Sequence, residues 1–133
     1  MQNFIYKLRV QIEDSDFAGV AYHANYLNYF ERARSEWMEQ NGYGIKWQLE
    51  NSVMFPIAHI SIDYLNPAFL GDELEIVIND LNVKKVGLIV DQHIRLRDNP
   101  EKILTKVSTK LACVNNKFKL IKIPEELKRE LSK

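Results

Sequence analysis

Apolar and polar side chains alternate along an early segment of the chain, residues 4–13. Tyr6, Leu8 and Val10 fall on one side of this alternation, and charged or polar residues fall on the other. A period of two is typical of a half-buried β-strand. The pattern therefore predicts a strand at this point.

The period lengthens over residues 24–40. Bulky residues recur there at spacings of three and four, and they are Tyr26, Phe30, Ala33 and Trp37. This pattern predicts one long helix with an apolar stripe that must be buried. Asn25 stands where a side-chain oxygen can cap the first turn, and Gly42 stands where a left-handed residue can end the helix.

Alternation returns after the helix, with turn-forming residues between the periodic segments. Strands are predicted at residues 55–65, 73–82, 85–97 and 102–115, and a turn at residues 66–72. Residues 44–51 are predicted to form a short irregular helix or a loop. A short helix is predicted over residues 124–133, with Pro124 at its first helical position.

These elements favour one architecture. One long helix followed by strands of largely hairpin connectivity can bury its stripe only by lying across a curved antiparallel sheet. The predicted class is α+β, as a single domain over residues 1–133. Such a sheet leaves its edge strands unpaired, and pairing between subunits is a common remedy. We therefore expect a homo-oligomer.

Composition and charge narrow the class of partner. The chain has 18 basic and 18 acidic side chains, so it has no overall field to attract nucleic acid. The sequence has no run of 18 consecutive apolar residues, so no membrane span is predicted. Cys113 is the single cysteine, which excludes an intrachain disulfide and favours a reducing compartment. We expect a cytoplasmic protein.

Candidate chemistry gathers in residues 14–26, DSDFAGVAYHANY. Gly19 permits a turn that would bring Asp16 toward the start of the long helix, where unpaired backbone N–H groups can hold negative charge on an oxygen. Asp16 could then activate water or attack a carbonyl. The alternative is that Asp14 and Asp16 only brace the turn. For His23, the backbone N–H is a stronger candidate than the side chain, which could simply form a cap.

Other polar and aromatic residues are candidates for substrate binding. Tyr22 and Tyr26 could line an acyl pocket, although aromatic residues at helical spacing commonly form core. His59 and Asp63 share one face of the predicted strand at residues 55–65. They could approach the site, or they could form a polar pair on the sheet surface.

Residues 14–34, DSDFAGVAYHANYLNYFERAR, resemble the signature of the 4-hydroxybenzoyl-CoA thioesterase family of hotdog-fold enzymes. Within that family, Tyr22, His23 and the FERAR ending most resemble the acyl-CoA thioesterases associated with the Tol-Pal system. Residues 62–74, IDYLNPAFLGDEL, resemble a second landmark. The resemblance implies the hotdog fold, in which a curved five-stranded antiparallel sheet wraps around one long helix, and an assembly that is a dimer or, more often, a homotetramer.

The resemblance also implies site residues. Asp16 takes the position of the catalytic carboxylate, acting as nucleophile or general base, and His23 takes the position whose backbone amide polarises the thioester carbonyl. Tyr22, Asn25, Tyr26 and His59 are the expected substrate-binding residues. The implied reaction is hydrolysis of an acyl-CoA, or of an acyl group on acyl-carrier protein, without cofactor or metal. The alternative is a hotdog protein that binds acyl thioesters or acts as a scaffold without cleaving them.

Overall fold

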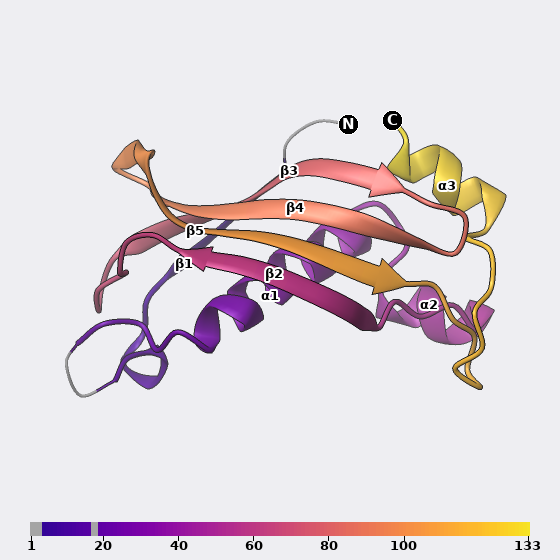
Figure 1. Cartoon of the computed structure of the whole chain (residues 1–133), viewed down its shortest axis with the longest axis horizontal. Helices are drawn as coiled ribbons and strands as arrows, with labels where there is room; N and C mark the ends of the chain where they lie inside the picture. The colour runs from indigo at the N-terminus through magenta and orange to yellow at the C-terminus, as the bar shows by residue number, and fades with distance from the viewer. Residues whose placement is uncertain (1–3, 17–18) are drawn as a thin grey trace.

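One long helix lies across a single face of a curved sheet (Figure 1). The computed structural model describes residues 4–16 and 19–133. Helix α1 (Asn25–Gln40) buries four residues, Tyr26, Tyr29, Phe30 and Ala33. Their spacing of three and four brings them to one side of the helix. The predicted stripe is confirmed except that Trp37 is only partly buried and Tyr29 is fully buried.

The sheet has the strand order β1-β3-β4-β5-β2, and every neighbouring pair is antiparallel. The strands are β1 (Phe4–Arg9), β2 (Ile57–Tyr64), β3 (Glu73–Val83), β4 (Gly87–Leu96) and β5 (Asn99–Ala112). Three consecutive strands form hairpins in the middle, and β1 and β2 lie at the edges. The predicted α+β class, with an antiparallel sheet of five strands around one helix, is confirmed.

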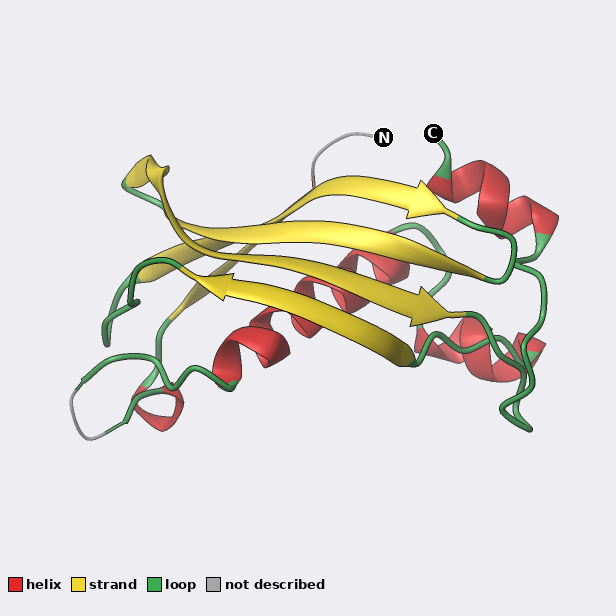
Figure 2. Cartoon of the chain, viewed as in Figure 1, coloured by secondary structure: helices red, strands yellow, loops and turns green. Residues whose placement is uncertain are grey.

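The face of the sheet that meets α1 is called the inner face here. It carries the alternating apolar side chains of the strands, for example Ile76, Ile94 and Val107, which pack with Tyr29 and Phe30. Burial of this apolar area from water is the main source of stability. A second buried cluster lies where the short helices α2 (Ile45–Asn51) and α3 (Glu125–Leu131) close one end of the sheet (Figure 2).

Several boundaries differ from the sequence prediction, and three of them have a clear local cause. Strand β1 ends at Arg9 because a 3-10 turn, η1 (Ile12–Asp14), follows it, and the Gln11 amide donates to the Asp14 carboxylate at 2.9 Å. Strand β5 begins at Asn99 because the connection to β4 is a tight turn. Pro124 is the N-cap of α3 rather than its first helical residue. Its extended backbone lies just outside the helix.

Cys113 is fully buried at the end of β5, in the cluster below α3. Burial raises the pKa of its thiol to about 11, because the charged thiolate is disfavoured away from water. The Cys113 thiol is therefore protonated at neutral pH, and the residue serves as part of the core. Across residues 4–16 and 19–133, no helix is both long and apolar enough to cross a membrane.

The outer face of the sheet is polar. His93 on β4 lies there, opposite Lys106 of β5, and its Nδ1 is 3.0 Å from the Asn79 Oδ1. Partial burial lowers the pKa of His93 below its ordinary value, and the positive charges of Arg95 and Lys106 lower it further. The folded state therefore favours the neutral imidazole.

Neutral His93 makes stability depend on pH. The unfolded chain takes up this proton near pH ~6.5, before the folded chain does, so stability is lost as the pH falls through and below that value. We expect His93→Gln to reduce the drop in melting temperature between pH 7 and pH 5. His59→Gln, on the same face but exposed, is the control. An equal drop in wild type and His93→Gln would contradict this account.

Candidate active site

The loop before α1 folds back on itself and fixes the backbone of Asp16. Ser15 and Ala21 form an antiparallel bridge, the Asp16 amide donates to the Val20 carbonyl at 2.9 Å, and the Gly19 amide donates to the Asp16 carbonyl at 3.1 Å. Gly19 has φ of +81°, a conformation that glycine adopts without a steric penalty. The predicted turn at Gly19 is therefore confirmed. Asp16 is partly exposed on this loop.

A second segment, residues 65–72, holds the loop from the other side. The Ala21 amide donates to the Ala68 carbonyl at 2.8 Å, and the Leu70 amide donates to the Gly19 carbonyl at 2.8 Å. The Ala68 amide in turn donates to the Tyr26 hydroxyl on α1 at 3.0 Å. The two stretches that carry the family resemblance, far apart in sequence, are thus bound to each other.

The start of α1 is tied to the loop by Asp14. Its carbonyl oxygen accepts the Tyr22 amide at 2.8 Å and the Asn25 Nδ2 at 2.9 Å. Asn25 is therefore the first helical residue, and the N-cap is Ala24, which makes no side-chain cap bond. The expectation of an Asn25 cap is wrong, because Asn25 lies inside the helix, where its Nδ2 donates to the Asp14 carbonyl and its Oδ1 accepts from the Asn28 Nδ2 at 3.4 Å.

His23 lies between this loop and the helix. Among the hydrogen bonds of the residues described, the His23 amide donates none, and its carbonyl accepts the Tyr26 amide at 3.3 Å. An unpaired N–H next to the positive end of a 16-residue helix can donate to a developing oxyanion. The His23 ring packs against Tyr22, with centroids 4.5 Å apart.

Asp14 and Tyr29 form the buried base of the loop. Asp14 is 7% exposed and Tyr29 is fully buried. Burial raises the pKa of Tyr29, and the nearby Asp14 carboxylate raises it further, so the phenol keeps its proton. Among the residues described, the Tyr29 hydroxyl has no hydrogen-bond partner within 3.5 Å, and Arg32 lies over its ring at 5.9 Å. These contacts support the loop but do not reach its exposed surface.

Tyr64 lies at the candidate site, and the sequence analysis did not identify it. Its hydroxyl donates to the His23 carbonyl at 3.3 Å, and its ring lies near those of His23 and Tyr26. Alternation along β2 could have found it, because Tyr64 shares the inner face with Ile60 and Ile62. It is 47% exposed, so it borders the opening beside His23.

His59 and Asp63 occupy the outer face of β2, paired with Lys110 and Lys106 of β5. Helix α1 and Tyr64 lie on the inner face. Within one chain the structure therefore brings Asp16, Tyr22, His23, Asn25 and Tyr26 together but does not bring His59 to them. A substrate-binding function of His59 stays a prediction.

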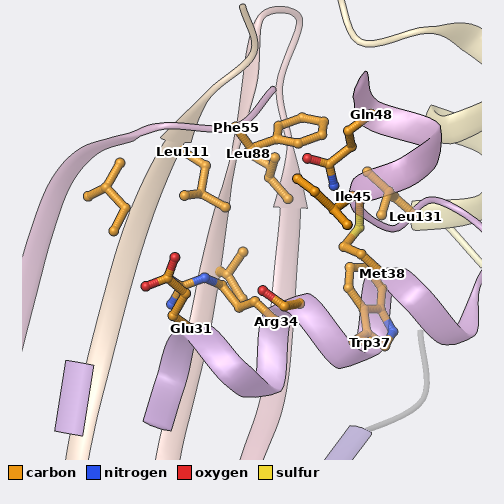
Figure 3. Close-up of a pocket in the computed structure, with 13 residues that line it drawn as sticks. Glu31, Arg34, Trp37, Met38, Ile45, Gln48, Phe55, Leu88, Leu111 and Leu131 are labelled. Carbon is orange, nitrogen blue, oxygen red and sulfur yellow. The ribbon is translucent and has the colours of Figure 1, made fainter. Parts of the chain in front are cut away.

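A cavity of about 210 Å³ lies farther along α1, between its second half, the inner face and the helices α2 and α3 (Figure 3). Leu88, Leu111 and Phe55 form much of its apolar wall. Arg34 and Glu31 line it from α1. From Asn25 to Arg34 the helix advances nine residues, or about 14 Å at ~1.5 Å per residue. The cavity is thus distant from Asp16 of the same chain.

A wrapped sheet with a carboxylate-bearing loop at the start of its central helix defines a hotdog domain of the thioesterase class. The chain belongs to the thioesterase-like superfamily, whose family model matches residues 10–131. This confirms the resemblance and the expected thioester-hydrolase family. The acyl-CoA thioesterase YbgC of Haemophilus influenzae is 36% identical over 127 residues, covering 94% of this chain and 91% of that protein. The Helicobacter pylori YbgC is 44% identical over 89 residues, covering 66% of this chain and 64% of that protein.

Solved structures agree on the fold. A 1,4-dihydroxy-2-naphthoyl-CoA thioesterase from Synechocystis has a TM-score of 0.89 at 22% identity, covering 98% of this chain and 96% of that one. A probable thioesterase from Bartonella henselae has a TM-score of 0.83 at 27% identity, covering 92% of this chain and 100% of that one. The hotdog fold is confirmed.

Tyr26→Phe tests the tie between α1 and residues 65–72. Removing the hydroxyl leaves the buried Ala68 amide without its acceptor, which costs about 1–3 kcal/mol. We expect the free energy of unfolding, measured with urea, to fall by that amount. Tyr22→Phe, on the surface, is the control and should change it by less than about 0.5 kcal/mol. Equal effects of the two substitutions would show that the bond contributes little.

Proposed function

We propose that this protein hydrolyses acyl-CoA thioesters, with Asp16 as the catalytic carboxylate and the His23 amide as the oxyanion donor. The observation that carries the proposal is the loop itself, whose bonds from residues 14–16 to residues 20–22 hold Asp16 beside the start of α1. The similarity to proteins named acyl-CoA thioesterases supports the substrate class.

In the proposed reaction the thioester carbonyl oxygen accepts a hydrogen bond from the His23 amide. Asp16 either removes a proton from water, whose oxygen then attacks the carbonyl carbon, or attacks that carbon itself to form a mixed anhydride that water hydrolyses. The carbon–sulfur bond breaks, and the thiolate leaves as CoA and takes up a proton. The amide and helix dipole stabilise the oxyanion formed on the way.

The other expected binding residues receive different parts in this proposal. Tyr22 and Tyr64, both partly exposed beside His23, would contact the substrate around the thioester. Asn25 and Tyr26 would act by holding the loop, through their bonds to Asp14 and Ala68. The carrier is CoA or acyl-carrier protein. We place the reaction in the cytoplasm, in keeping with the single reduced cysteine.

Asp16→Asn tests catalysis. The amide is nearly isosteric but neither accepts a proton nor attacks effectively, so kcat should fall by ~100-fold or more. Release of free thiol from a panel of short-chain, long-chain and aromatic acyl-CoA substrates is the measurement. Asp98→Asn, in the exposed turn between β4 and β5, is the matched control. A fully active Asp16→Asn enzyme would exclude the mechanism. Tight acyl-CoA binding by a wild type that cleaves no substrate would favour the non-hydrolytic alternative.

We further propose that the protein forms a dimer in which edge strand β2 pairs antiparallel with its copy. Among the strands that the structure describes, β2 pairs only with β5 and its other edge has no partner, and Ile57 and Tyr64 are 47% exposed at its two ends. An unpaired edge of eight residues invites such pairing. Further association of dimers through the polar outer face would give the expected homotetramer.

This pairing would join two parts that lie apart in one chain. A two-fold axis near the middle of β2 would set Ile57 beside Tyr64 of the partner subunit. Ile57 lines the cavity, and Tyr64 contacts His23. The cavity of one subunit would then receive the acyl group of a thioester held at the Asp16 loop of the other.

A mixing experiment tests the shared site. Asp16→Asn removes the carboxylate, and Met38→Trp fills the cavity from α1; each protein alone should be nearly inactive. Mixed in urea and refolded, half of the dimers are hybrids with one complete site, so about a quarter of wild-type activity should return. Circular dichroism confirms that both variants fold. No recovery, with hybrids verified by mass, would show that each chain has its own complete site.

A further inference from the structure

Arg34 is a cation that lines the cavity and, among the residues described, forms no ion pair within 4.0 Å. Its Nη1 donates to the Gln92 Oε1 at 3.0 Å, and this neutral amide oxygen does not cancel the positive charge. Among the residues described, no carboxylate oxygen lies within 4.0 Å of its guanidinium. Burial lowers the pKa of Arg34, and only the charge of Glu31 opposes this effect. The cavity therefore contains a partly desolvated positive charge.

Gln92 fixes the position of that charge. It is 2% exposed on the inner face of β4, among Leu88, Val90 and Ile94, and its Nε2 donates to the Phe30 carbonyl at 3.1 Å. The Gln92 Oε1 accepts from Arg34 and its Nε2 donates to Phe30, so both polar atoms of the side chain form hydrogen bonds. The guanidinium is thus held at one place and presents its remaining donors.

A guanidinium has five N–H donors, and one hydrogen bond uses one of them. Among the residues described, the fully buried side-chain nitrogen and oxygen atoms without a hydrogen-bond partner belong to Tyr29, Thr105 and Thr109. No Arg34 nitrogen is among them, so the Arg34 nitrogens that make no hydrogen bond are not fully buried. Arg34 lines the cavity from α1, while Leu88, Leu111 and Phe55 lie across from it (Figure 3). A purely hydrocarbon occupant would remove water from these donors and give nothing back.

We propose that the cavity selects acyl groups that carry a carboxylate at the end remote from the thioester, and that Arg34 binds this carboxylate. The inference rests on the proposed thioesterase function. Two oxygens of a carboxylate match the planar guanidinium fork and neutralise its charge. Glu31 lines the same cavity, but its side chain is exposed and its charge is screened by water. A cavity of about 210 Å³ has room for several non-hydrogen atoms of an acyl chain.

The test compares hexanoyl-CoA with the CoA thioester of adipic acid, which has the same chain length and a terminal carboxylate. We expect wild type to prefer the carboxylated substrate in kcat/KM by about tenfold or more, the effect of one charge-assisted hydrogen bond. Arg34→Met should abolish this preference, and Arg34→Lys should retain part of it. Gln92→Glu should also lower it, because the new carboxylate would pair with Arg34. Arg32→Met, on the exposed side of α1, should keep the wild-type ratio.

Equal or better cleavage of hexanoyl-CoA by wild type, or an unchanged ratio in Arg34→Met, would overturn the proposal. If neither thioester is cleaved, the proposed function fails and binding decides the inference separately. Calorimetry with monomethyl adipate and methyl hexanoate then serves as the test. Tighter binding of monomethyl adipate that is lost in Arg34→Met supports the carboxylate site, and equal binding of the two esters excludes it. Melting temperatures show whether each variant is folded, and Gln92→Glu gives an independent answer if Arg34→Met is not.

Discussion

Helix α1 can bury Tyr29 and Phe30 only by lying across the inner face of the sheet, and most of the molecule follows from that contact. The sheet must curve around the helix, and among the strands that the structure describes the three middle ones are paired on both edges while β1 and β2 are paired on one edge only. The start of the helix must come to the end of β2 that carries Tyr64. The loop before the helix is then close enough to be tied down by Asp14 and Ala68.

Local patterns predicted the elements well because each has a strong period. The stripe of α1 and the alternation along β4 both survive in the structure. Predictions of element boundaries failed where a single hydrogen bond determines the end of the element. Asn25 is a residue type that commonly forms an N-cap, yet its side-chain amide donates to the backbone carbonyl of Asp14, eleven residues earlier. The early end of β1 similarly depends on the Gln11 amide finding the Asp14 carboxylate.

The local arrangement of the candidate site was predictable in part for the same reason. Asp16, Gly19 and His23 lie within one short stretch, so a turn was enough to associate them. Tyr64 and Gln92 come from strands far along the chain, and their contacts depend on register. Gln92 did give a signal, since it is a polar residue within an otherwise apolar face. Such an interruption in a strand pattern marks a partner on the element packed above it, here Arg34 and the Phe30 carbonyl.

Cys113 has a practical meaning for work on this enzyme. A thiol that is fully buried, with a pKa of about 11, reacts slowly with disulfide reagents because they require an accessible thiolate. It is the only thiol in the chain. A colour reagent that detects the CoA released from a thioester would thus meet almost no background from the folded protein. The same residue would become reactive when the core opens, which makes one mole of thiol per chain a stoichiometric indicator of unfolding.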